Sequence, residues 1–200
     1  MQESSPHTKK KTGLFFGSFS PIHLGHMAIA NFMVSYTDLE AIWFVVSPQN
    51  PLKPSTHLWD EQFRLQLVKK AVEGIPFFAV CDLEFFLPRP SYTIDTLQSL
   101  TEQYPDREFV LVMGSDGLAQ FSLWKAAHEI IARYQRYIYP RHDSEPFGES
   151  LHSMAIANAT VVQAPRIEIS STFIRKSLAE QRDVRCFVPE PVWPLIKARY

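Results

Sequence analysis

Two histidines, His23 and His26, lie where an apolar strand is expected to pass into a helix. Residues 12–16 form an apolar run that predicts a strand, the residues after it predict turns, and the spacing over 24–34 predicts a helix. In an open α/β sheet, the start of such a helix offers unpaired N–H groups and partial positive charge to an anion. Gly25 leaves room for a ligand atom, so the pattern favours a phosphate site over two half-exposed surface histidines.

The same pair of imidazoles does not make a metal site. The His-x-Gly-His spacing supplies only two ligands, and no third histidine, cysteine or paired carboxylate lies near it in sequence. Cys81 and Cys186 are the only cysteines and lie far apart, which predicts reduced and buried thiols instead of a disulfide framework. We therefore expect chemistry that depends on hydrogen-bond donors.

A second set of donors follows the last predicted strand. Ser170, Ser171 and Thr172 predict the start of a helix, and Arg175 lies in its first turns. A cation there opposes the helix dipole, which is tolerated more readily when an anion binds the same helix end. Lys53, in a proline-rich loop, is either a solvated surface lysine or a further phosphate ligand. Neither cation has an evident packing role.

Two other segments allow both a chemical and a plain structural interpretation. Asp116 follows an apolar strand, where it could accept hydrogen bonds from ribose hydroxyls or cap a helix. Ser91 or Thr93 would cap the helix that begins there. Trp124, in a later helix, should face the core or the wall of a pocket.

The elements that would position these residues alternate along the chain, which predicts an α/β fold with a Rossmann-like, open, mainly parallel sheet flanked by helices. We expect a flexible tail over 1–11 and a single domain over 12–200, with a loop and a short helix over 141–158. Strands are predicted over 12–16, 41–47, 76–83, 107–113, 134–140 and 159–165, and helices over 24–34, 60–74, 91–104, 121–131, 170–178 and 189–197.

Composition sets the outer bounds. The chain has 200 residues, of which 46% are hydrophobic and 15 are Phe, enough to fill the core of one domain. The formal net charge of −1 gives no support to a nucleic-acid groove or a membrane surface, so an anion must be met by local positive charge. The polar, basic N-terminus resembles neither a signal peptide nor a membrane anchor, and we expect a cytoplasmic protein.

Three motifs carry a family resemblance. Gly17-Ser-Phe-Ser-Pro-Ile-His-Leu-Gly-His26 resembles the (T/H)xGH signature of the nucleotidyltransferase superfamily, and Ile169-Ser-Ser-Thr-Phe-Ile-Arg175 resembles its second signature. Arg89-Pro-Ser-Tyr-Thr-Ile-Asp-Thr-Leu97 is similar to a segment of one branch, the bacterial nicotinate-nucleotide adenylyltransferases. Two positions depart from the family pattern: Ser20 replaces the usual Asp or Asn, and Phe16 stands where many members have glycine.

The resemblance implies transfer of the adenylyl group of ATP to nicotinate mononucleotide, giving nicotinate adenine dinucleotide and pyrophosphate in NAD biosynthesis. Mg²⁺ is expected on the ATP phosphates, and the enzyme could be a monomer or a homo-oligomer. Catalytic roles are implied for His23, His26, Lys53 and Arg175. ATP or phosphate binding is implied for Gly17, Ser18, Phe19, Gly25, Gly114, Asp116, Ser170, Ser171, Thr172 and Ile174, and mononucleotide binding for Tyr92, Thr93, Trp124 and Lys125.

Two alternatives remain open at the level of sequence. Another nucleotidyltransferase branch, such as the phosphopantetheine enzymes, shares the HxGH motif but not the segment around Tyr92. A nucleotide sensor that binds ATP without turning it over would belong to a different functional class, and Ser20 is the one residue that leans toward it.

Overall fold

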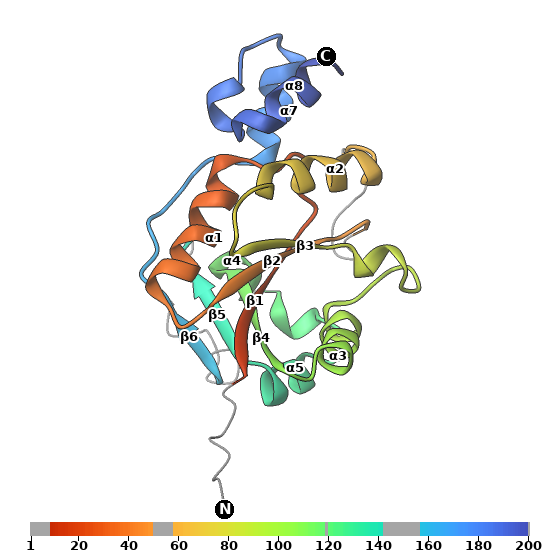
Figure 1. Cartoon of the computed structure of the whole chain (residues 1–200), viewed down its shortest axis with the longest axis vertical. Coiled ribbons are helices and arrows are strands. Elements are labelled where there is room, and N and C mark those ends of the chain that lie inside the picture. The colour runs from red at the N-terminus through yellow and green to blue at the C-terminus, as the bar shows by residue number, and fades with distance from the viewer. Residues whose placement is uncertain (1–8, 50–57, 119, 142–156, 200) are drawn as a thin grey trace, which may run out of the picture.

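The structure, a computed structural model, describes residues 9–49, 58–118, 120–141 and 157–199. Six parallel strands form one sheet in the order β3-β2-β1-β4-β5-β6, with helices on both faces (Figure 1). The predicted Rossmann-like α/β fold is confirmed. The strands are β1 (Lys10–Gly17), β2 (Ala41–Val46), β3 (Phe78–Cys81), β4 (Arg107–Gly114), β5 (Arg136–Tyr139) and β6 (Ala159–Val161).

The helices alternate with these strands as the sequence predicts. No helix within the described ranges combines the length and the apolar character needed to cross a membrane. The α-helices are α1 (Leu24–Tyr36), α2 (Glu61–Val72), α3 (Thr93–Gln103), α4 (Ser115–Leu118), α5 (Ala127–Arg133), α7 (Ser171–Ala179) and α8 (Trp193–Lys197), and short 3₁₀ helices are η1 (Leu83–Phe85), η2 (Phe121–Leu123), η3 (Arg185–Phe187) and η4 (Glu190–Val192).

The strand order reverses direction between β1 and β4, which are neighbours at the centre of the sheet. Both strands are apolar because helices cover both of their faces, and the last six residues of β4 are all buried. Gly17 at the end of β1 pairs with Val46, the last residue of β2, and Gly114 pairs with Tyr139 at the end of β5. The loops that follow these strands therefore leave the same edge of the sheet, where ligands bind in open α/β folds.

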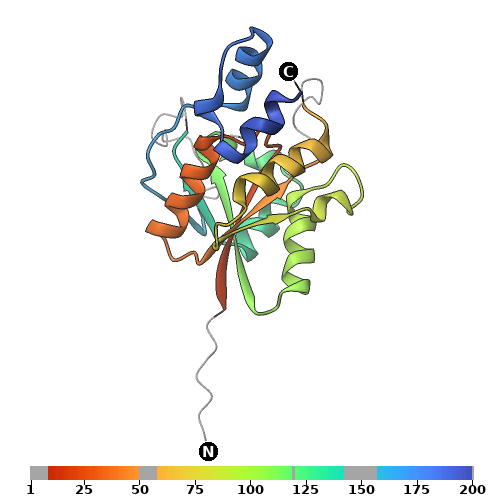
Figure 2. The ribbon, with the colours of Figure 1, turned by 45° about the horizontal axis from the view of Figure 1, so that its top comes forward.

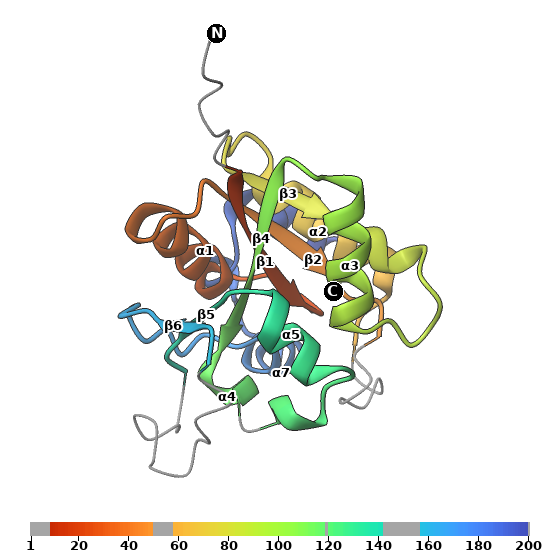
Figure 3. The same cartoon turned by 90° about the horizontal axis from the view of Figure 1, so that it is seen from below.

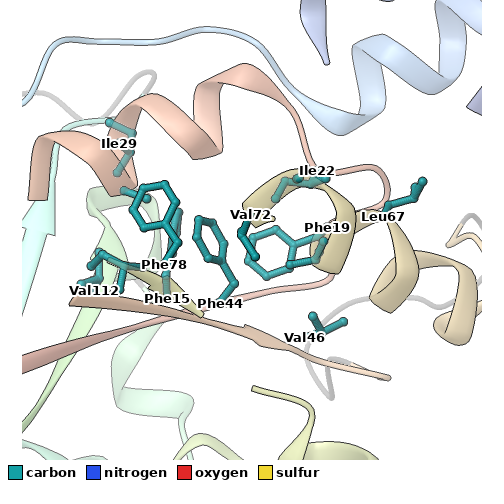
Figure 4. Packing of buried hydrophobic residues seen from close by; sticks show 14 of the residues in the cluster. Phe15, Phe19, Ile22, Ile29, Phe44, Val46, Leu67, Val72, Phe78 and Val112 are labelled. Carbon is teal, nitrogen blue, oxygen red and sulfur yellow. The ribbon is translucent and has the colours of Figure 1, made fainter. Parts of the chain in front are cut away.

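A layer of core residues lies on each face of the sheet. Figure 4 shows Phe15 and Phe44 pointing from the strands toward α1 and α2, with Phe19 and Ile22 of the β1–α1 loop packed beside them. η4 and α8 pack beside α2 on this side (Figure 2). α3 and α5 lie on the other face of the sheet (Figure 3), where they cover a second cluster that includes Leu97.

Several sequence predictions differ from the structure. The strands predicted over 76–83 and 159–165 are shorter, and the helix predicted over 189–197 is η4 followed by α8. β1 begins at Lys10, two residues before the predicted strand. The helix predicted over 121–131 is divided into η2 and α5, because Ala126 adopts a left-handed conformation with φ of 53°. Cys81 is buried as predicted, whereas Cys186 is exposed, and both thiols are free. Most of the segment 141–158 lies outside the described residues.

Candidate active site

A cavity of about 370 Å³ opens at the carboxyl edge of the sheet, beside the junction of β1 and β4. A second cavity, of about 20 Å³, is lined by His23 and His26, the two histidines of the predicted phosphate site. Phe15, Tyr139 and Arg141 line both cavities, so the two adjoin. Eight predicted site residues line the larger cavity, namely Gly17, Ser18, Tyr92, Thr93, Gly114, Asp116, Trp124 and Lys125, and three line the smaller one, His23, Gly25 and His26.

The two imidazoles lie face to face at the start of α1. His23 immediately precedes the helix and is 3% exposed, and its ring centroid lies 3.7 Å from that of His26. The backbone N–H of His23 donates to Nδ1 of His26 over 3.2 Å. Since that nitrogen accepts a hydrogen bond, the proton of a neutral His26 resides on Nε2, which is then available as a donor to a ligand.

Burial keeps both imidazoles uncharged near neutral pH. Desolvation, assisted by the positive charge of Arg141, lowers the pKa of His23 to about 3. Desolvation also lowers the pKa of His26 well below its usual value, with smaller effects of His23 and Arg141. Near neutral pH the two side chains are therefore neutral, with one N–H each.

Gly17, the last residue of β1, and Gly25, in the first turn of α1, make room for protein atoms. A Cβ on Gly25 would come within 3.0 Å of the His23 ring and 3.1 Å of Ile167. The absence of a side chain at Gly25 thus makes room for the His23 ring, and because Gly25 also lines the smaller cavity, its room for a ligand atom stays a prediction. A Cβ on Gly17 would meet the ring of Phe19 at 2.7 Å. That ring is 2% exposed, so Phe19 is a packing residue whose side chain cannot reach a ligand.

The start of α7 binds the carbonyl oxygens of the β1–α1 loop. Ser170 caps the helix as predicted, accepting a hydrogen bond from the N–H of Phe173 over 3.1 Å. Ser171 donates through its hydroxyl to the Pro21 carbonyl over 2.9 Å, and Arg175 donates to the Ser20 carbonyl over 2.7 Å. The expectation that Arg175 lacks a structural role is therefore wrong.

The remaining predicted residues of this helix are less directly placed. Thr172 accepts a hydrogen bond from Arg175 over 3.3 Å. Ile174 is fully buried and belongs to the core. Neither these two residues nor Ser170, Ser171 and Arg175 lines either of the two cavities. Lys53 lies outside the described residues.

Ser20, the departure from the family motif, has a defined structural partner. Its hydroxyl oxygen accepts the backbone N–H of Trp59 over 2.9 Å, and the side chain is 1% exposed. This bond joins the loop after β1 to the segment that precedes α2. The hydroxyl therefore fixes loop geometry from inside the protein and does not face a substrate.

Asp116, which lines the larger cavity, lies beside Arg141, which lines both. The carboxylate of Asp116 is 3.5 Å from the Arg141 guanidinium, and the Arg141 backbone N–H donates to the Ser115 hydroxyl over 2.9 Å. Asp116 is the second residue of α4, so its interpretation as a helix cap is wrong. A Cβ on Gly114 would collide with the Asp116 carboxylate and lie 2.9 Å from the Arg141 side chain, so glycine there admits this pair.

At the other end of the larger cavity, aromatic residues meet the start of α3. Trp124 is half-buried and packs against Phe121 with ring centroids 5.1 Å apart, which confirms its predicted place in a pocket wall. Lys125 Nζ lies 4.7 Å from the centroid of the Tyr92 ring and 2.9 Å from each carboxylate oxygen of Asp95. This wall presents aromatic faces, a cation and the unpaired N–H groups of a helix start.

Glu84 is a buried carboxylate in the wall of the larger cavity. It is 2% exposed and accepts hydrogen bonds from the hydroxyls of Ser91, over 2.9 Å, and Thr96, over 3.0 Å. The residue before α3 is Tyr92, whose side chain makes no capping bond, so the prediction of Ser91 or Thr93 as the cap is wrong. Ser91 instead binds a carboxylate from the segment after β3.

Sequence reasoning missed Arg141 and Glu84. Arg141 is the first residue of a segment without periodicity, although its position directly after the fifth strand places it at the ligand-binding edge. Glu84 lies between apolar residues in a proline-containing stretch, where a carboxylate is a usable signal of a buried polar contact. Within the described ranges, no group of three or more His, Cys, Asp or Glu side chains could hold a metal ion.

Comparison with known proteins bears on the whole chain. The cytidylyltransferase-like family model matches residues 14–177. The chain is 47% identical over 189 residues to a Bacteroides thetaiotaomicron protein named probable nicotinate-nucleotide adenylyltransferase, covering 94% of this chain and 92% of that one. A protein of the same name from Cytophaga hutchinsonii is 44% identical over 189 residues, covering 94% and 96%.

A solved structure supports the fold independently. Plasmodium falciparum nicotinic acid mononucleotide adenylyltransferase complexed with NaAD is similar with a TM-score of 0.75 and 19% sequence identity, over 94% of this chain and 96% of that one. The motif at His23 and His26 and the match over nearly the whole length thus agree. The chain belongs to the cytidylyltransferase-like family and, within it, to the nicotinate-nucleotide adenylyltransferases.

Proposed function

We propose that the protein transfers the adenylyl group of ATP to nicotinate mononucleotide, giving nicotinate adenine dinucleotide and pyrophosphate, a step of NAD biosynthesis. The observation that carries this proposal is the pair of adjoining cavities that share Arg141. One contains neutral N–H donors at a helix start, which suits phosphates, and the other has an aromatic wall, which suits a pyridine ring. The names of the relatives support the same activity.

The reaction joins two phosphates without a protein nucleophile. An oxygen of the mononucleotide phosphate bonds to the α-phosphorus of ATP, and the bond from that phosphorus to the β-phosphate oxygen breaks, releasing pyrophosphate. A phosphate monoester has a second pKa of about 6 and is largely dianionic at neutral pH, so no general base is needed. Catalysis then depends on aligning the two phosphates and stabilising the charge that develops on them.

The chain offers hydrogen-bond donors and cations for the negative charge on the transferred and leaving phosphates. His26, through Nε2–H, and His23 would donate to the triphosphate beside α1. Arg141, between the cavities, is placed for the phosphates that meet there, and Lys53 and Arg175 are proposed to add positive charge. Because the two imidazoles are neutral and held by the fold at the start of α1, their orientation costs little at the moment of reaction.

The wall at α3 would bind the rest of the mononucleotide, and Asp116 would bind the ribose of ATP. The Asp116 carboxylate, 50% exposed, can accept hydrogen bonds from ribose hydroxyls. Tyr92, Thr93, Trp124 and Lys125 surround the space that the pyridine ring would occupy. Mg²⁺ enters this scheme as part of the substrate, MgATP, because the described residues contain no cluster able to hold it alone.

The test is pyrophosphate release by the purified protein with ATP and Mg²⁺. Nicotinate mononucleotide, nicotinamide mononucleotide and phosphopantetheine are offered separately, with a sample in excess EDTA as the metal control. We expect release with nicotinate mononucleotide and its loss in EDTA. Release only with phosphopantetheine would assign the protein to another branch, and tight ATP binding without release would identify a sensor.

A further inference from the structure

Arg64 is a buried cation that binds only carbonyl oxygens. It lies in the first turn of α2 and is 1% exposed. Its Nε donates to the Trp59 carbonyl over 3.0 Å, Nη1 to Ser18 over 2.5 Å and to Ser47 over 2.8 Å, and Nη2 to Pro48 over 2.7 Å. Four of the five N–H groups of the guanidinium are used, and they join the loops that follow β1 and β2 to the start of α2.

The position of Arg64 lowers the stability of the folded state if its role is only structural. A cation in the first turn of a helix opposes the helix dipole, and a buried charge loses its hydration. No carboxylate in the described part of the chain lies within 4.0 Å of the Arg64 guanidinium, although Asp60 and Glu61 act on it from further away. Apolar side chains of similar volume usually stabilise such positions at least as well.

The carbonyls that Arg64 binds belong to the active-site edge. Ser18 and Ser47 both line the larger cavity, and Ser18 lies between β1 and the two histidines. A carbonyl oxygen facing a triphosphate would repel it, whereas one turned onto a guanidinium leaves the neighbouring peptide N–H groups free to face the anion. Arg175 binds the carbonyl oxygen of Ser20, two residues further along the same loop, in the same way.

We propose that Arg64 is a positioning residue for adenylyl transfer: it orients the loops after β1 and β2 for the ATP phosphates without touching the substrate. The inference rests on the proposed function. A misplacement of about 1 Å in a loop that aligns reacting phosphates can lower a rate about 100-fold, so the effect should be seen in turnover. Lysine cannot replace arginine here, because it keeps the charge but loses the planar fork that reaches four carbonyls.

The experiment compares Arg64→Lys with Arg136→Lys. Arg136 is also buried, lies 4.8 Å from the Phe121 ring centroid and donates to the Ala157 carbonyl, but it lines neither cavity. Melting temperatures and steady-state kinetics for both substrates are measured well below the lower melting temperature. We expect both variants to lose thermal stability, but only Arg64→Lys to lose kcat, by about 10- to 100-fold.

Equal kcat values in the two variants, with a similar loss of melting temperature, would overturn the proposal and leave Arg64 a structural residue. An inactive wild-type protein would instead refute the proposed function. If Arg64→Lys does not fold, wild-type protein with ¹⁵N-labelled arginine is titrated with a non-hydrolysable ATP analogue and Mg²⁺. The Arg64 Nε–H signal should then shift while that of Arg136 does not, and an unmoved Arg64 signal would contradict the proposal.

Discussion

The Ser91 hydroxyl donates a hydrogen bond of 2.9 Å to the carboxylate of Glu84, joining the segment after β3 to the segment that leads into α3. Thr96, one turn into the helix, donates to the second carboxylate oxygen. Burial raises the pKa of Glu84 even though hydroxyl donors act against the shift. One buried carboxyl group thus fixes the backbone that carries Tyr92 and Thr93 into the mononucleotide wall.

Replacing Glu84 by Gln should change how stability depends on pH. The pKa of Glu84 in the folded protein lies above its usual value of 4.5, so the native state holds its proton to higher pH than the unfolded chain. The wild-type protein therefore loses stability as pH rises from about 4.5 through the raised pKa, a loss that Gln does not share. The free energy of unfolding of both proteins can be measured with urea between pH 4.5 and 8. As pH rises, that of Glu84→Gln should increase relative to that of the wild type. A difference that is constant with pH, or one matched by the partly exposed control Asp82→Asn, would contradict this prediction.

His26→Ala should lower kcat about 100-fold or more, the loss expected for one preorganised donor to developing charge. The loss of the contact between the His26 and Phe19 rings, whose centroids lie 5.0 Å apart, should lower stability somewhat, but the fold should survive because residue 26 as a whole is only half-buried. His128→Ala, at an exposed position of α5, is the control and should keep wild-type kinetics. Wild-type turnover in a folded His26→Ala variant would remove this residue from the catalytic set.

Acid should destabilise the protein through His23. Burial and Arg141 lower its pKa from 6.5 to about 3, so below pH 6.5 the unfolded chain binds a proton that the native state refuses. Stability is therefore lost as pH falls from about 6.5 toward 3. In His23→Asn this loss should be smaller, which chemical unfolding between pH 4 and 7 can measure. The same pH slope in both proteins would show that His23 does not carry the effect.

Nicotinate mononucleotide should be preferred to its amide. Nicotinate has only acceptors in its carboxylate, whereas the amide adds an NH₂ group that a wall of N–H and O–H donors leaves unpaired. Burying that group costs about 1–3 kcal/mol, or roughly 5- to 150-fold in kcat/KM. The start of α3, with the Thr93 hydroxyl and Lys125, supplies such donors. Equal kcat/KM values for the two mononucleotides would mean that the ring is bound by other groups.

Much of the fold could be predicted from sequence, because the decisive signals are local. The central strands are uninterrupted apolar runs, and the alternation with helical spacing then implies a parallel sheet with a ligand edge. His23 and His26 could be found because a histidine pair at a strand–helix joint is itself the signal. The division of the helix predicted over 121–131 could not be predicted, because a non-glycine residue in the left-handed region, here Ala126, does not change the spacing of hydrophobic residues.

The contacts that shape the site could not be predicted, because they join residues far apart in the chain. Ser91 looks like a helix cap until the Glu84 carboxylate is seen beside it, and Ser20 looks like a lost acidic ligand until the Trp59 N–H is found on its oxygen. The neutral state of the histidines likewise depends on burial, which sequence spacing does not report. Arg64 fits an amphipathic helix poorly, and that misfit was its only local signal.

The hydrogen bonds from α7 to the β1–α1 loop have a consequence for synthesis of the chain. Arg175 binds the carbonyl of a residue 155 positions earlier, and Ser171 binds one 150 positions earlier. On the ribosome the loop emerges among the first segments, but these donors emerge only after the sheet has been made. In a nascent chain, the β1–α1 loop therefore cannot form these hydrogen bonds until Arg175 has left the exit tunnel. ATP should bind only to chains whose synthesis is nearly complete.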